Sequence, residues 1–205
     1  MDYTTLASDE QIAKTVAALT EHGLTTTVVE NGAAALAKIK EMIPAGASVM
    51  NGASRTLEQI GFVDFLKSGT HGWNNLHEAI LAEKDPAKQA QLRKQAVLSD
   101  YYLGSVHALT ETGEFVVASN SGSQLPHIIF TSRNVILVVS TQKIVPALKE
   151  AFDRLEKQVV PLEDQRMRER HGVGTAISKL LVFKRESKFG GRNVQMILVK
   201  EKLGF

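Results

Sequence analysis

The stretch TTTVVENGAAALAKIKEMIPAGASVM, residues 25–50, contains a predicted strand, a helix and a second strand. Thr25–Val29 is made of β-branched residues, which favour extended backbone. Residues 32–43 predict a helix, and Asn31 before them is suited to its N-cap. Residues 47–50 then form a short apolar strand. Because two strands joined by a helix usually pair in parallel, this stretch predicts an α/β sheet with crossover helices.

The rest of the chain continues this pattern. The segment 135–139 is entirely apolar, as is typical of a parallel strand buried on both faces. Residues 106–118 predict a β-hairpin around a Thr-Gly turn. Further helices are predicted at 8–22, 144–158 and 163–170, and a last strand at 193–199. The expected fold class is α/β, a mostly parallel open sheet flanked by helices. We expect one domain over residues 1–205, with a helical excursion at 73–99.

Composition excludes several classes of function. The 205 residues include 24 Lys and Arg against 22 Asp and Glu, a net charge of +2, which is not the charge density of a nucleic-acid-binding protein. Cysteine is absent, which excludes disulfides, thiol catalysis and zinc or iron–sulfur centres held by cysteine. His71 and His77 lack the spacing of a zinc pair on one helix face, so no metal site is predicted.

The sequence also bears on location and assembly. No apolar run is long enough to cross a bilayer. The start Met1-Asp2-Tyr3-Thr4 has neither the basic residues nor the apolar core of a secretory signal. We therefore expect a cytoplasmic protein without membrane or nucleic-acid partners. A homodimer is left open, because an unpaired edge strand or apolar helix face could form one.

Three polar loops, at residues 51–56, 120–124 and 140–143, follow predicted strands. Ligands of open α/β sheets bind beyond the carboxyl ends of the strands, so we predict that these loops form one site for a small anion. The predicted ligand-binding residues are Gly52, Ser54, Arg55, Thr56, Asn120, Gly122, Ser123, Gln124, Gln142 and Lys143.

Each loop also has a plainer interpretation. Arg55 can bind a carboxylate or phosphate through two hydrogen bonds, but Thr56 followed by Gln59 is also a good helix-capping pattern. The second loop is either a ligand loop or a plain connection. Lys143 is either a surface charge or the cation that balances an anionic ligand.

Three carboxylates are candidates for catalytic acid–base or nucleophilic work: Glu58, Asp100 and Glu111. Glu58 lies one helical turn beyond Arg55, so a surface ion pair is the alternative. Glu111 is next to the hairpin turn, where an exposed acid is ordinary. A catalytic role for any of them requires a second polar group nearby, which only the fold can supply.

The order of several segments resembles the lactate utilization (LUD) domain family, also known as DUF162. The run NGASRTLEQIG at 51–61 resembles the family's Gly-x-Ser-x-Thr-Leu-x-x-Ile-Gly segment. The residues DYYLG and ALTETG within 100–113 resemble its central hairpin. The segment GSQLP at 122–126 resembles a loop of one branch. Gln142–Val145, Pro161–Asp164 and Leu203–Phe205 also match, so the likeness covers nearly the whole chain.

This resemblance implies a fold similar to those of ribose-5-phosphate isomerases, glucosamine-6-phosphate deaminases and CoA-transferases. It also implies a small-anion-binding accessory subunit in the oxidation of L-lactate to pyruvate, acting with separate iron–sulfur partner proteins. Many members carry a cysteine cluster where this chain has the cysteine-free segment 166–188. No cofactor is therefore expected in this chain. The alternatives are a free-standing isomerase or transferase acting on a phosphate- or CoA-bearing molecule, and a structural partner without a ligand.

Overall fold

The computed structural model describes residues 2–187 and 189–205. Met1, and Lys188 at the end of the cysteine-free segment, lie outside the described residues. The centre of the molecule is a six-stranded sheet of order β1-β10-β7-β4-β2-β3, in which every pairing is parallel. Its strands are β1 (Thr25–Val29), β10 (Asn193–Val199), β7 (Asn134–Ser140), β4 (Tyr101–Gly104), β2 (Ser48–Asn51) and β3 (Asn74–Asn75). The predicted α/β class with a parallel sheet is confirmed.

A second sheet of four strands has the order β8-β5-β6-β9. Its strands are β8 (Ile144–Val145), β5 (Ala108–Thr110), β6 (Phe115–Ser119) and β9 (Lys179–Phe183). β5 and β6 pair antiparallel, which confirms the predicted hairpin. The hydrophobic pattern did not predict this second sheet or β9. The helix predicted from residue 144 begins only at Leu148, because Ile144 and Val145 pair with β5 instead.

Helices pack on both faces of the large sheet. The longer ones are α1 (Asp9–Glu21), α2 (Gly32–Met42), α3 (Arg55–Gln59), α4 (Phe62–Lys67), α5 (Leu76–Ala82), α6 (Pro86–Gln95), α7 (Leu148–Arg154) and α8 (Val160–His171). Single turns are η1 (Ala96–Leu98), η2 (His127–Thr131), η3 (Thr141–Lys143) and η4 (Leu155–Val159), of which η2 and η4 are π-helical.

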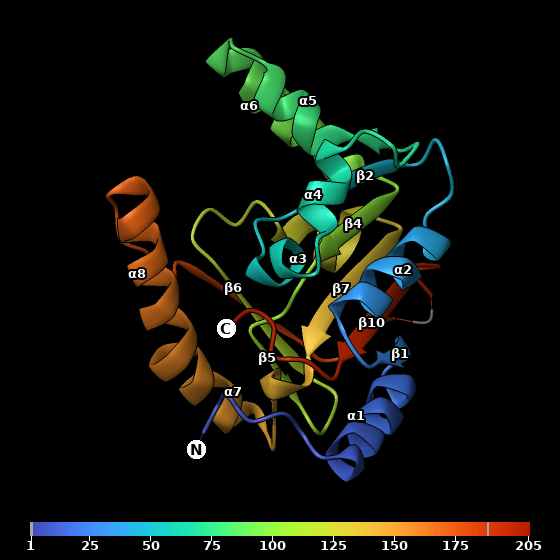
Figure 1. Ribbon diagram of the computed structural model, residues 1–205, viewed down its shortest axis with the longest axis vertical. Helices are drawn as coiled ribbons and strands as arrows, with labels where there is room; N and C mark the ends of the chain where they lie inside the picture. Colours follow the sequence, from blue (N-terminus) through green and yellow to red (C-terminus); the bar gives the residue numbers. More distant parts are fainter. Residues whose placement is uncertain (1, 188) are drawn as a thin grey trace.

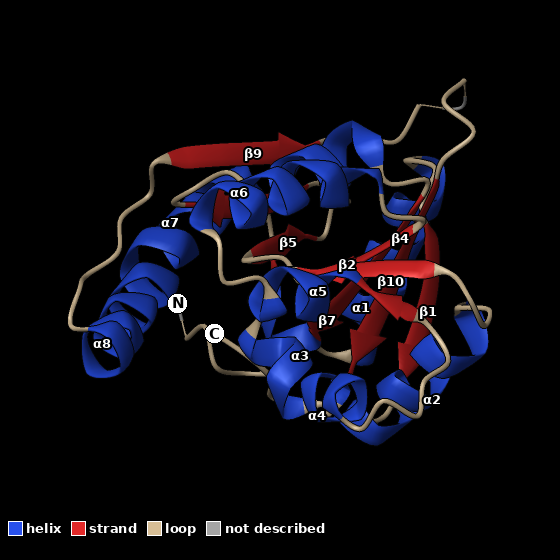
Figure 2. Cartoon of the chain, turned by 90° about the horizontal axis from the view of Figure 1, so that it is seen from above, coloured by secondary structure: helices blue, strands red, loops and turns tan. Residues whose placement is uncertain are grey.

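Strand β7 shows why the sheet is covered on both sides. Val135, Leu137 and Val139 pack with α1 and the β5–β6 hairpin, whereas Ile136 and Val138 pack with α2, α3 and α4. All five side chains are fully buried, as the apolar run predicts. Figure 2 shows α2, α3 and α4 together along one side of the large sheet.

Two helical regions extend from this body. The predicted excursion at 73–99 contains α5, α6 and η1, and α6 buries none of its residues (Figure 1). Helix α8 follows the π-helical turn η4 and also buries none of its residues. The C-terminus lies between α8 and the strands (Figure 1). Among the described residues, no helix has both the length and the apolar character needed to cross a membrane.

Candidate functional site

A cleft of about 420 Å³ lies between the strand ends and α8. One wall comes from the loops that follow β2, β4 and β6, which the parallel sheet and the hairpin bring together. The opposite wall comes from η4, α8 and residues 175–177, and the C-terminal Gly204 and Phe205 contribute to the lining. Eight of the ten predicted ligand-binding residues line this cleft: Gly52, Ser54, Arg55, Thr56, Asn120, Ser123, Gln124 and Lys143.

The first loop combines a helix cap with a buried hydroxyl. Ser54, and not Thr56, caps α3, because its hydroxyl accepts a hydrogen bond from the backbone N–H of Leu57 at 3.3 Å. Thr56 is therefore free of the capping role that its spacing to Gln59 suggested, and its side chain is buried. At Gly52, a Cβ atom would come within 2.6 Å of the Tyr102 hydroxyl, so only glycine fits there.

Lys143 is the central cation of the cleft. It follows β7 on η3, and it is 3% exposed. Its Nζ donates to Thr56 Oγ1 at 3.1 Å, to Ser105 Oγ at 3.2 Å and to the Val106 carbonyl at 3.1 Å. Within residues 2–187 and 189–205, no carboxylate forms an ion pair with it. Burial, assisted by the positive charge of Arg154, lowers the pKa of Lys143 to about 7.

A second buried cation lies behind the same wall. Arg154 has no exposed side-chain surface, and it donates through Nη1 to the carbonyl of His107. Its Nε and Nη2 have no hydrogen-bond partner in the described part of the chain. Burial lowers the pKa of Arg154 to about 10, so this guanidinium remains charged at neutral pH. Lys143 and Arg154, neither of which forms an ion pair with a carboxylate among the described residues, give the cleft a positive potential.

His107 supplies a neutral donor to the cleft wall. Its Nδ1 accepts a hydrogen bond from the backbone N–H of Ala118 at 3.1 Å. Burial, followed by the charges of Lys143 and Arg154, lowers the pKa of His107 to about 3. The imidazole is therefore neutral at physiological pH, and its proton is on Nε2.

The second loop closes another side of the cleft. Gln124 donates from Nε2 to the Ala118 carbonyl at 3.1 Å. Asn120 accepts from the Ser178 hydroxyl at 2.8 Å, which ties the loop to the segment before β9. Gly122 has a φ of 84° and does not line the cleft. Gly122 was predicted to bind the ligand, but in the structure it is a turn residue outside the cleft.

Gln142 lies outside the cleft and holds one of its walls in place. It is 7% exposed, and its Nε2 donates to the carbonyls of Leu203 and Gly204, both at 3.2 Å. These bonds hold the C-terminal segment beside Lys143. Gly204 has a φ of 67°, and a Cβ atom there would come within 2.9 Å of Lys143 Nζ. Gln142 therefore positions a wall of the cleft without lining it.

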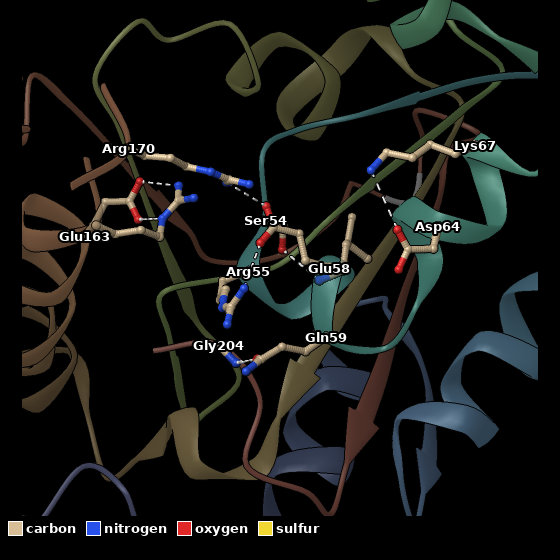
Figure 3. Close-up of polar contacts among 11 residues, drawn as sticks. Ser54, Arg55, Glu58, Gln59, Asp64, Lys67, Glu163, Arg170 and Gly204 are labelled. Atoms are coloured by element: carbon tan, nitrogen blue, oxygen red, sulfur yellow. Dashed lines mark hydrogen bonds and ion pairs between the residues drawn. The ribbon is translucent and has the colours of Figure 1, made fainter. Parts of the chain in front are cut away.

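The rim of the cleft carries arginines that are paired with carboxylates. Arg55 donates to Glu58 at 3.1 Å, and Arg170 reaches from α8 to the same carboxylate at 3.4 Å (Figure 3). Glu163 and Arg166 form a bidentate pair at 2.7 and 2.8 Å. Burial raises the pKa of Glu58, but the three arginines outweigh it, and the net change lowers this pKa. Glu58 therefore carries a negative charge paired with Arg55, which lines the cleft, but Glu58 itself does not line it.

The other two predicted carboxylates lie away from the cleft. Asp100 precedes β4, at the opposite end of that strand, and accepts hydrogen bonds from the N–H and hydroxyl of Ser48 at 2.9 and 2.6 Å. Glu111 is bound by Gln11 and Lys14 of α1 at 3.0 and 2.9 Å. Neither residue lines the cleft. The three predicted loops converge, but the three predicted carboxylates do not join them in one site.

Sequence reasoning missed Ser105, His107, Arg154 and Arg166. Ser105 and His107 lie before or within the predicted hairpin at 106–118, and the two arginines lie in the helices predicted at 144–158 and 163–170, where no pattern marks them as site residues. Among the described residues, no group of three or more His, Cys, Asp or Glu side chains is arranged to hold a metal ion.

Comparisons with known proteins agree with this architecture. The model of the LUD domain family matches residues 12–198. The crystal structure of a DUF162 family protein from Deinococcus radiodurans superposes with a TM-score of 0.58 at 14% sequence identity, covering 95% of this chain and 99% of that one. At this identity the likeness shows a shared fold alone. A comparison with curated protein sequences gives no match.

Proposed function

Because this chain belongs to the LUD domain family, which is named for lactate utilization, we propose that it binds a small organic anion in the cleft at Lys143. The observation that carries this proposal is a lysine 3% exposed, with hydroxyl and carbonyl partners and no carboxylate ion pair in the described part of the chain. A buried ammonium without a counter-charge is costly, and an anionic ligand removes that cost.

The hydrogen bonds around Lys143 indicate how the anion is held. Two of its three N–H groups are donated to hydroxyl oxygens, those of Thr56 and Ser105. A hydroxyl that accepts from an ammonium keeps its own proton for another partner. Both residues line the cleft. The Thr56 hydroxyl can donate to a carboxylate or phosphate, with Lys143 supplying the charge behind it. Ser105 Oγ instead donates to the Val106 carbonyl at 3.5 Å.

In this proposal the chain is an accessory subunit of lactate utilization. Lactate oxidation requires a redox centre, and without cysteine this chain cannot hold a cysteine-ligated iron–sulfur cluster. The electrons are therefore carried by separate iron–sulfur partner proteins. The cleft supplies recognition of the acid or of a related anion.

A second candidate is an isomerase- or transferase-type enzyme for a phosphate- or CoA-bearing molecule. The observation that favours it is the cleft volume of about 420 Å³. A cavity of roughly 150 Å³ already holds benzene, which has as many heavy atoms as lactate. Lactate alone leaves much of the cleft to water, whereas a larger phosphorylated ligand fills it.

Calorimetric titration tests the anion site. The probes are L-lactate, pyruvate, inorganic phosphate, AMP and CoA, each added to the wild type, to Lys143→Met and to Lys88→Met. Lys88 is exposed on α6 and serves as the charge-matched control. We expect at least one probe to bind the wild type and Lys88→Met equally, and Lys143→Met at least tenfold more weakly. Equal binding to all three proteins would contradict the proposal.

A further inference from the structure

Ser105 lies beside the buried lysine. It lies in the segment between β4 and β5. Residues 104–107 all line the cleft, and Ser105 and His107 are the two that are partly exposed. A serine and a neutral histidine therefore face the same cavity, two residues apart on one strand end.

The contact between Ser105 and Lys143 joins a hydroxyl to an amine. In the charged form Lys143 Nζ donates to Ser105 Oγ, and in the neutral form the serine hydroxyl can donate to Nζ instead. Lys143 Nζ is 3.2 Å from Ser105 Oγ. The lysine is held by two further contacts, with Thr56 Oγ1 and the Val106 carbonyl, so its amine is fixed in direction. A hydroxyl within hydrogen-bond reach of a positioned base is the arrangement that activates serine in enzymes with serine–lysine pairs.

We propose that Ser105 and Lys143 form a serine–lysine pair that catalyses acyl transfer from a carboxylic ester or thioester bearing an anionic group. Ser105 Oγ is the nucleophile, and Lys143 Nζ is its general base. The proposal rests on the proposed function in one respect, since the anionic part of the substrate occupies the positive cleft. It adds a covalent reaction that binding alone does not require.

The first half of the reaction needs no cofactor, because Ser105 and Lys143 supply the nucleophile and the base. Neutral Lys143 takes the proton from Ser105 Oγ as that oxygen forms a bond to the carbonyl carbon, and the carbonyl π electrons move to its oxygen. The Nε2–H of His107 donates to this oxyanion. Collapse of the intermediate breaks the bond to the alcohol or thiol, which leaves with the proton from Lys143. The acyl group remains on Ser105 as an ester.

The second half uses water as the only co-reactant. Lys143 takes a proton from water, the resulting hydroxide attacks the acyl-serine, and the Ser105 oxygen leaves with the proton that Lys143 returns. The product is a carboxylic acid. A lysine can act as a base near neutral pH only when its pKa is strongly lowered, and burial lowers the pKa of Lys143 to about 7.

A fluorophosphonate probe and mass spectrometry test the pair. We expect a covalent adduct on Ser105 in the wild type, with a labelling rate that rises with pH around a midpoint near 7. Ser105→Ala removes the adduct. Lys143→Met slows labelling at least tenfold, and circular dichroism establishes that both variants are folded. Ser68→Ala is the control, because Ser68 is exposed and does not line the cleft.

The turnover of p-nitrophenyl acetate and of acetyl-CoA gives an independent readout, with an initial burst as the acyl-serine accumulates. Absence of an adduct on Ser105, or equal labelling of Lys143→Met and the wild type, would overturn the pair. Binding of the calorimetric probes without labelling would leave the anion site standing and refute the acyl transfer. Labelling without binding of any probe would refute the anion site instead.

Discussion

Replacement of Lys143 by methionine changes how the free energy of unfolding depends on pH. Lysine has an ordinary pKa of 10.5, and in the folded chain the pKa of Lys143 is about 7. Between these values the unfolded chain binds more protons, so the wild type gains stability as the pH rises. Burying the charge costs about 5 kcal/mol at pH 6, where both states are protonated, and about 2 kcal/mol at pH 9.

The variant lacks this titration. It also leaves the hydroxyls of Thr56 and Ser105 without their lysine partner, but this loss is nearly independent of pH. We therefore expect the stability difference between the wild type and Lys143→Met to shift by about 3 kcal/mol in favour of the wild type from pH 6 to pH 9.

Urea unfolding monitored by circular dichroism at several pH values measures this shift. Lys88→Met, which removes an exposed charge, should track the wild type across the range. A constant difference between the wild type and Lys143→Met would refute the reasoning, because it would mean that Lys143 keeps its charge in the folded state up to pH 9.

Three further substitutions distinguish residues that support anion binding from residues that support only the fold. Gly204→Ala forces a Cβ atom toward Lys143 at a φ of 67°, so we expect a loss of about 1–3 kcal/mol in unfolding free energy and weaker anion binding by calorimetry. Asp100→Asn weakens a hydrogen-bonded contact at the far end of β4, so urea unfolding should show a loss of about 1 kcal/mol while anion affinity is unchanged. Arg170→Ala removes a partly exposed ion pair with Glu58, and thermal unfolding should change by less than about 1 kcal/mol, with a smaller change at high salt.

Local patterns were sufficient to predict β1, β2, β7 and β10 of the large sheet. The apolar run of β7 and the β-branched run of β1 predict parallel strands from their own residues. β3 was not predicted, because its two residues lie in the segment expected to be helical. Parallel pairing explains the convergence of two of the three loops, since it places the carboxyl ends of β2 and β7 at one edge of the large sheet. The loop 120–124 follows β6 of the second sheet, which the sequence did not predict, so its position was not predictable in the same way.

The chemistry inside the cleft could not be predicted in the same way. The environment of Lys143 depends on Thr56, 87 residues away, and on Ser105, 38 residues away. No local pattern reports such contacts. Asp100 was predicted as a candidate catalytic carboxylate, but it precedes β4 and therefore lies at the end of that strand opposite to the cleft. Ser105 and His107 follow the other end of β4, and no local pattern marked them.

The titration of Lys143 itself tests the central claim most directly. NMR of protein labelled with ¹³C and ¹⁵N at the lysine side chains, with Lys143→Met to assign the signal, gives its pKa with and without inorganic phosphate. We expect a midpoint near 7 in the free protein that moves upward when the anion binds, because the anion stabilises the charged amine. A midpoint near the ordinary 10.5, unchanged by phosphate, would contradict this expectation.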